Sequence, residues 1–165
     1  MKHLLSVVAA LLLLPLAAAL AQKTLPDVEV KTLDGESVSA STLAAAADGP
    51  AVVAFWATWC APCKKELDAY AESYEEWRDD FGAEVYAVTI DTRRQLSKVR
   101  PMVESKGWAF PILSDANQQL QQALNFQTVP QVYVVDREGA IVYSHSGYVP
   151  GDELEVAEQL AKLAR

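Results

Sequence analysis

The sequence predicts an α/β fold in which one central mixed β-sheet is flanked by helices. Two apolar segments of strand length, residues 51–56 and 85–90, are each followed by a stretch with helical periodicity. This order is typical of parallel strands joined by helices. Alternating segments around tight turns, at residues 28–39 and 132–144, add antiparallel hairpins. The chain contains no internal repeat, low-complexity segment or linker.

Residues 1–21 are predicted to be a signal peptide. Lys2 and His3 precede an almost continuous apolar run, and Ala19-Leu20-Ala21 supplies the small residues that a signal peptidase recognises. We expect cleavage after Ala21 and one domain over residues 22–165, outside the cytoplasm. A retained membrane anchor is the alternative, because the apolar run approaches the roughly 17 residues that a short span needs.

The expected domain is acidic. The chain has 14 Lys and Arg against 22 Asp and Glu, and all the acidic residues lie beyond residue 21. Since there is also no basic stripe, nucleic acid and anionic membrane surfaces are poor candidates for partners.

A hairpin and a short helix are expected first. The hairpin spans residues 28–39 around an Asp34-Gly35 turn. Ser41 is expected to cap a helix that runs through Ala47, and Asp48-Gly49-Pro50 ends it.

The strand at residues 51–56 is followed by the longest predicted helix, over residues 62–81. Pro62 fits the first helical turn, and Gly82 ends the helix. Apolar side chains recur at intervals of three and four residues, which predicts a buried stripe. The stripe comprises Leu67, Tyr70, Tyr74, Trp77 and Phe81.

The second half continues with a helix over residues 92–106, in which Pro101 is expected to introduce a kink. A short extended piece follows at residues 108–113, and Asp115 is expected to cap a helix through Leu124. After the terminal hairpin, Asp152 is expected to cap the last amphipathic helix.

Cys60 and Cys63 are the only cysteines in the chain, and they form a Cys-x-x-Cys motif between a predicted strand and a predicted helix. The helix N-terminus, with Lys64 and Lys65 nearby, should stabilise a thiolate at Cys60. Cys60 is therefore the expected nucleophile, and Cys63 is the expected resolving thiol of a redox-active disulfide. A zinc half-site and a purely structural bridge are the alternatives. We expect no metal, since zinc would need two more ligands and the mature chain offers only His145.

The segment from Phe55 to Glu66 resembles the active-site segment of thioredoxin-fold proteins, specifically the exported TlpA/ResA-like branch. The resemblance extends from Leu25-Pro26-Asp27 to the last helix. It implies a thioredoxin-like fold with an N-terminal β-hairpin extension and a helical insertion before the strand that follows a cis-proline. In this branch Thr128-Val129-Pro130 matches the cis-proline segment, which would present the backbone of Val129 to an extended substrate. An ordinary trans proline is the alternative.

Glu66 matches an acid that in this branch adjusts thiol pKa values and moves protons. A solvated glutamate on the helix face is the alternative. Thioredoxin itself carries a buried acid in the preceding strand, where this chain has Ala54, and this difference favours the TlpA/ResA-like branch.

Trp59, Pro62, Val129 and Pro130 are the expected substrate-binding residues. Phe55 and Trp56 are expected in the core. His145 lies on the terminal hairpin, where we expect an ordinary strand residue, and the Asp79-Asp80 pair is expected to be a solvated helix end.

The resemblance implies an exported disulfide reductase, because proline before the second cysteine is similar to the reducing members of the superfamily. Its expected partners are protein disulfides and a membrane-embedded thiol donor for re-reduction, with no cofactor and a monomeric state. Cytochrome c maturation is a candidate role, although residues 125–129 lack the glycine-rich pattern of the dedicated members.

Two other functions remain open at this point. One is a Sco-like copper carrier, which would require a wider cysteine spacing and a histidine ligand. The other is a peroxiredoxin-like peroxidase, which would require a Pro-x-x-x-Thr-x-x-Cys setting, whereas Thr58 lies two residues before Cys60 and no proline stands at position 54.

Overall fold

The computed structural model describes residues 23–47 and 49–164. The predicted signal peptide at residues 1–21 lies outside this part of the chain. In the part that the structure describes, no helix is both long enough and apolar enough to cross a membrane.

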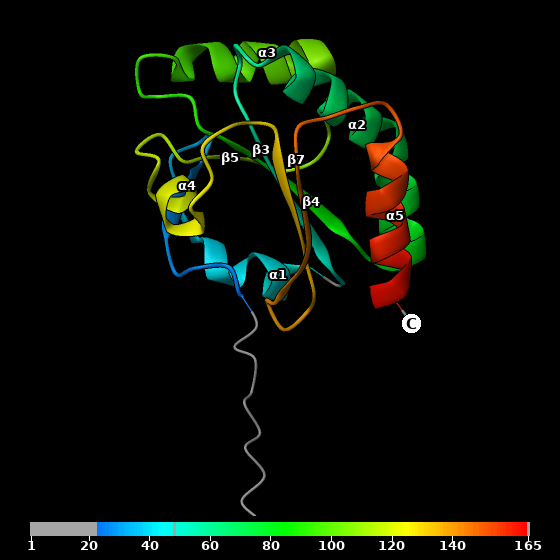
Figure 1. Ribbon diagram of the computed structural model, residues 1–165. Helices are drawn as coiled ribbons and strands as arrows, with labels where there is room; N and C mark the ends of the chain where they lie inside the picture. Colours follow the sequence, from blue (N-terminus) through cyan, green and yellow to red (C-terminus); the bar gives the residue numbers. More distant parts are fainter. Residues whose placement is uncertain (1–22, 48, 165) are drawn as a thin grey trace, which may run out of the picture.

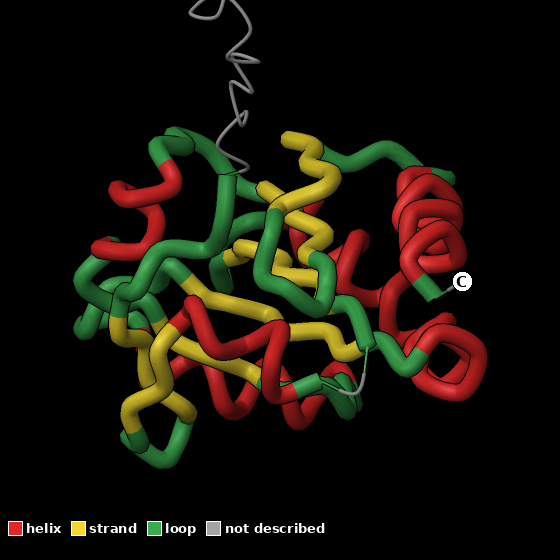
Figure 2. The backbone as a smooth tube through the Cα atoms, turned by 90° about the horizontal axis from the view of Figure 1, so that it is seen from below, coloured by secondary structure: helices red, strands yellow, loops and turns green. Residues whose placement is uncertain are grey.

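The described residues form one mixed sheet with the strand order β2-β1-β5-β4-β3-β6-β7. Its centre consists of the parallel strands β3 (Ala51–Trp56), β4 (Glu84–Thr89) and β5 (Ile112–Ser114). The strands β6 (Gln131–Val135) and β7 (Ile141–Ser146) add antiparallel pairs on one side. The predicted α/β fold is therefore confirmed, and Figure 2 shows the strands gathered in the middle of the molecule.

The N-terminal hairpin extends the sheet on its other side. It consists of β1 (Glu29–Thr32) and β2 (Ser37–Ser39), and β1 pairs antiparallel with β5. Gly35 makes the turn with φ 90°, a value that favours glycine.

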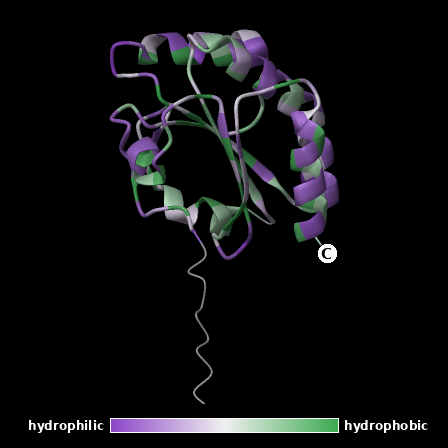
Figure 3. Ribbon diagram, viewed as in Figure 1, coloured by the Kyte–Doolittle hydropathy of each residue, from purple (hydrophilic) through white to green (hydrophobic). Residues whose placement is uncertain are grey.

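Five α-helices accompany the sheet in the described residues: α1 (Leu43–Ala46), α2 (Ala61–Phe81), α3 (Val99–Lys106), α4 (Gln119–Leu124) and α5 (Asp152–Leu163). Helices α2 and α5 pack side by side, and α4 lies at the opposite side of the molecule (Figure 1). Hydrophobic residues concentrate toward the sheet, while the outer turns of α5 are largely hydrophilic (Figure 3).

The core follows the predicted apolar pattern. All six residues of β3 are buried, including Phe55 and Trp56, and so are Tyr70, Tyr74 and Trp77 of α2. Gly82 ends α2 in the left-handed conformation, with φ 62°.

Three predicted details of the helix ends are wrong. Ser41 lies inside a short 3₁₀ turn (Ala40–Thr42), and Thr42 precedes α1 without a side-chain cap. Gly151 takes the capping position of α5, so Asp152 is its first helical residue. The helix predicted over residues 92–106 begins at Val99, after a 3₁₀ turn at Leu96–Lys98, so Pro101 lies in its first turn, where its missing N–H interrupts no α-helical hydrogen bond.

Candidate functional site

Cys60 occupies the capping position at the start of α2, as predicted. Its backbone N–H donates to the carbonyl oxygen of Ala57 at 3.0 Å, and its Sγ accepts from the backbone N–H of Cys63 at 3.3 Å. The two sulfurs form a disulfide. The first helical turn therefore directs unsatisfied backbone N–H groups and the positive end of the helix dipole toward Cys60.

The two cysteines differ in exposure. Cys60 is 5% exposed and Cys63 is fully buried. Beside them, Trp59 is 60% exposed, and Pro62 is also exposed. Of the two cysteines, only Cys60 therefore keeps any exposed surface.

The loop before Cys60 is held by Asp91, a residue that the sequence analysis did not single out. The carboxylate of Asp91 accepts hydrogen bonds from the Thr58 backbone N–H at 2.7 Å and from the Thr58 hydroxyl at 2.9 Å. The hydroxyl of Thr89 donates to the same carboxylate at 2.8 Å. Asp91 is fully buried, and its position directly after a buried strand was the available signal.

The two lysines that follow the motif, Lys64 and Lys65, differ in their contacts. The Lys64 ammonium donates to the carbonyl oxygen of Thr58 at 3.0 Å, at the base of the same loop. Lys65 is exposed to solvent. Only Lys64 is therefore hydrogen-bonded within the loop that carries Cys60.

Val129 and Pro130 lie directly opposite the disulfide. The bond between them is cis, as predicted. The carbonyl oxygen of Val129 is 3.7 Å from the Sγ of Cys60, and the side chain of Val129 is half-buried. The structure therefore brings the predicted substrate-binding backbone next to the predicted nucleophile.

Glu66 is buried below the disulfide, one helical turn after Cys63. Only 1% of its side chain is exposed, and its carboxyl oxygen lies 2.9 Å from the Nε2 of His145 on β7. Residues three apart on a helix share one face, so Glu66 lies on the same side of α2 as Cys63. The expectation that Glu66 could be a solvated helix-face residue does not hold.

The prediction that His145 is an ordinary strand residue is wrong. Its side chain is 14% exposed and contacts the buried carboxyl group of Glu66. The Nδ1 of His145 has no hydrogen-bond partner among the residues that the structure describes. The alternation of β7 places His145 on the same inward face as Ile141 and Tyr143, and this pattern could have identified it.

Burial raises the pKa of Glu66 above its ordinary value, and the hydrogen bond and charge of His145 oppose this rise. Tyr70 is buried on the next turn of α2. Its own burial and the neighbouring carboxyl group of Glu66 raise the pKa of Tyr70 well above its ordinary value. Glu66 is therefore a carboxyl group with a raised pKa in a nearly dry environment.

A metal site was not expected here. Within residues 23–47 and 49–164, no three His, Cys, Asp or Glu side chains are grouped so that they could hold a metal ion.

The chain is similar in sequence to thioredoxin-like proteins and thiol-disulfide oxidoreductases. The model of the AhpC/TSA family matches residues 21–144. The thioredoxin-like protein YneN of Bacillus subtilis is 33% identical over 79% of this chain and 74% of its own length. The thiol-disulfide oxidoreductase ResA of the same organism is 32% identical over 53% of this chain and 48% of its own length.

Solved structures agree with this result. The solution structure of a thioredoxin-like protein from Porphyromonas gingivalis is 37% identical and superposes with a TM-score of 0.74. The match covers 85% of this chain and 91% of the other. The thioredoxin-like fold that the sequence predicted is therefore confirmed.

Proposed function

This chain belongs to the AhpC/TSA family and is a thioredoxin-fold thiol-disulfide oxidoreductase, and from that premise we propose that it is an exported reductase of protein disulfides. The observation that carries the proposal is the pairing of Cys60, which keeps 5% of its surface exposed, with a fully buried Cys63 that lies one helical turn before the buried carboxyl group of Glu66.

The reaction starts from the dithiol form. The Cys60 thiolate attacks one sulfur of a substrate disulfide, forms a mixed disulfide and releases the other substrate sulfur as a thiolate. Cys63 then loses its proton and attacks the Sγ of Cys60. This step frees the second substrate sulfur and leaves the Cys60–Cys63 disulfide that the structure contains. Two electrons pass from the protein to the substrate.

Glu66 is the acceptor for the proton that Cys63 loses. The carboxylate form of Glu66 can take this proton, and a raised pKa makes it a stronger base than an ordinary glutamate. His145 holds the carboxyl group in place through the contact at 2.9 Å. Either His145 Nε2–H donates to the carboxylate, or the protonated carboxyl group donates to Nε2. The contact can therefore persist in both states of Glu66.

Substrate docking involves Val129, Pro130, Trp59 and Pro62. An extended peptide can pair with the backbone of Val129, whose carbonyl group lies beside Cys60. The exposed indole of Trp59, the residue before Cys60, offers an apolar contact to the same substrate.

Export completes the proposal. A signal peptide at residues 1–21 would deliver the domain to the periplasm, where a reductase needs a membrane-embedded thiol donor to return it to the dithiol form. Its substrates would be disulfides of exported proteins, with apocytochrome c among them. The domain would act as a monomer.

Trapping of the mixed disulfide tests this function. In a Cys63→Ser variant, a substrate that has reacted with Cys60 cannot be released. The variant should therefore accumulate covalent complexes with exported proteins that dissolve on addition of dithiothreitol. A Cys60→Ser variant is the matched control and should trap none. Equal trapping by both variants, or none by either, would contradict the assignment of Cys60 as the nucleophile.

The match to the AhpC/TSA family also favours one alternative, a thiol peroxidase. A peroxidase would require the reduced protein to consume hydrogen peroxide with a rate that depends on Cys60. Rapid reduction of insulin disulfides, with no peroxide consumption above that of the Cys60→Ser variant, would exclude this alternative.

A further inference from the structure

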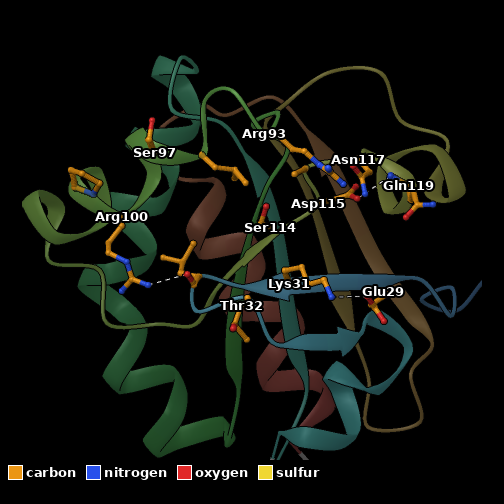
Figure 4. A pocket seen from close by; sticks show the side chains of 15 residues that line it. Glu29, Lys31, Thr32, Arg93, Ser97, Arg100, Ser114, Asp115, Asn117 and Gln119 are labelled. Atoms are coloured by element: carbon orange, nitrogen blue, oxygen red, sulfur yellow. Dashed lines mark hydrogen bonds and ion pairs between the residues drawn. The ribbon is translucent and has the colours of Figure 1, made fainter.

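A second cavity lies apart from the cysteine pair, between the N-terminal hairpin, the segment that follows β4 and the end of β5. Its volume is about 710 Å³, within the range of small-molecule sites. The cavity combines apolar and charged side chains with hydroxyl and amide groups (Figure 4). The residues used below are Leu33, Leu96, Pro101, Arg93, Arg100 and Ser114.

The cavity lies where open α/β sheets commonly bind ligands. Strands β3, β4 and β5 are parallel, so their carboxyl ends share one edge of the sheet. Cys60 follows the end of β3, and the cavity is built around the end of β5, where Ser114 is the last strand residue. Ligand sites concentrate outside the carboxyl ends of parallel strands.

Two of the three cationic side chains that line the cavity already form ion pairs. Arg100 forms an ion pair with Asp34 at 2.7 Å, and Lys31 forms one with Glu29 at 2.9 Å. Arg93 makes no hydrogen bond or ion pair with any residue that the structure describes. In a chain of net charge −8, an arginine without a partner at an apolar cavity is a ready site for an anion.

The acidic side chains of the cavity do not neutralise Arg93, because Glu29 is paired with Lys31 and Asp115 binds backbone N–H groups. The two carboxylate oxygens of Asp115 accept hydrogen bonds from the backbone N–H groups of Gln119 and Gln121, each at 2.9 Å. Both oxygens of Asp115 are therefore already hydrogen-bonded to the first turn of α4. Arg93 therefore remains the cation that is available to a ligand.

The hydroxyl group of Ser114 is a second feature of the cavity that suits a polar ligand. Ser114 is 6% exposed, and its hydroxyl group is buried without a hydrogen-bond partner among the described residues. Figure 4 shows its side chain projecting into the middle of the cavity. Because a buried hydroxyl group without a partner destabilises the fold, a ligand oxygen that accepts its hydrogen bond would remove this cost.

We propose that this cavity binds a small amphipathic carboxylate. The carboxylate oxygens accept hydrogen bonds from the Ser114 hydroxyl group and the Arg93 guanidinium. The apolar part of the ligand packs against Leu33, Leu96 and Pro101. A dianion such as phosphate fits less well, because it offers nothing to the apolar wall and only one cation is free to meet it.

The test uses the complete oxidised domain and the fluorescent anion 1-anilinonaphthalene-8-sulfonate as the probe. The probe should bind, and octanoate should displace it, whereas 1-octanol and inorganic phosphate at the same concentration should displace much less. Arg93→Ala should weaken octanoate binding by at least about tenfold, as expected for loss of a charge-assisted hydrogen bond. Arg94→Ala is the matched control, because Arg94 is the next residue, is exposed like Arg93 and does not line the cavity.

Ser114→Ala separates a ligand contact from a structural role. The variant should be at least as stable as the parent without octanoate, since it removes an unpartnered buried hydroxyl group, and yet it should bind octanoate more weakly. Three results would overturn the proposal: no probe binding, equal displacement by octanoate and 1-octanol, or equal effects of Arg93→Ala and Arg94→Ala. Insulin reduction should be unchanged in Arg93→Ala, so failure here leaves the reductase proposal standing.

Discussion

His145 contacts the buried carboxyl group of Glu66 at 2.9 Å and thereby connects the terminal hairpin to the helix that carries both cysteines. The two residues are 79 positions apart in the sequence. The Glu66 side chain is almost completely shielded from solvent, so His145 provides part of the polar environment that water would otherwise supply. In the proposed mechanism, this contact positions the carboxyl group that accepts the proton of Cys63.

Glu66→Gln should slow disulfide reduction by about 100-fold or more, the typical contribution of a positioned general base. Glutamine keeps the size of the side chain but cannot accept the proton of Cys63. Single-turnover reduction of insulin by the dithiol form measures the effect. Glu76→Gln, at an exposed position of the same helix, is the control and should leave the rate unchanged. A Glu66→Gln variant with the parental rate would show that Glu66 does not handle this proton.

The same substitution should change the pH dependence of stability. The pKa of Glu66 is raised in the folded protein, so the folded protein binds this proton more tightly than the unfolded chain. The stability contribution of Glu66 is thus largest below the ordinary pKa of 4.5 and is lost as the pH rises through the raised value. Thermal unfolding of the oxidised protein should show that the stability of Glu66→Gln, relative to that of the parent, increases as the pH rises. A constant difference at all pH values would contradict the raised pKa.

His145→Ala should raise the pKa of Glu66 further, because it removes the partner that opposes the effect of burial. The pH profile of insulin reduction should then shift to higher pH. The variant should also lose roughly 1–3 kcal/mol of stability above that pH, since it leaves a buried carboxylate without its partner. His145→Gln can still donate a hydrogen bond and should recover most of the stability. An unshifted pH profile in His145→Ala would mean that the contact has only a structural role.

Asp91→Ala should destabilise the domain by roughly 2–4 kcal/mol, because it leaves the Thr58 and Thr89 donors without their acceptor. It should also slow disulfide reduction, since the loop before Cys60 loses its anchor. Asp80→Ala, at the exposed end of α2, is the control and should change neither property. Chemical denaturation and insulin reduction measure the two effects separately, and a stable variant with full activity would exclude an anchoring role.

Local patterns in the sequence predicted most of the fold. The continuous apolar run of β3, the stripe of α2 and the turn at Gly82 are each set by neighbouring residues, so periodicity was sufficient. The helix starts at Ser41 and Asp152 were misplaced because several polar residues near each start can take the capping position, and tertiary packing selects among them.

The site was predictable only in its local part. Cys60, Cys63 and Pro62 lie in one motif, whereas the partner of Thr58 comes from the segment after β4 and the partner of Glu66 comes from β7. Such contacts depend on sheet order and register, which one sequence does not specify. The cavity around Ser114 was missed for the same reason, because the pairing of β1 with β5 creates it.

The reduction potential of the Cys60–Cys63 pair tests the central claim most directly. Equilibration of the full domain with glutathione or dithiothreitol buffers, followed by quantification of the two thiols, gives the value. A reductase of protein disulfides predicts a potential near that of thioredoxin, about −270 mV. A potential near about −120 mV, the value of a strong oxidant, would contradict the proposed direction of electron flow.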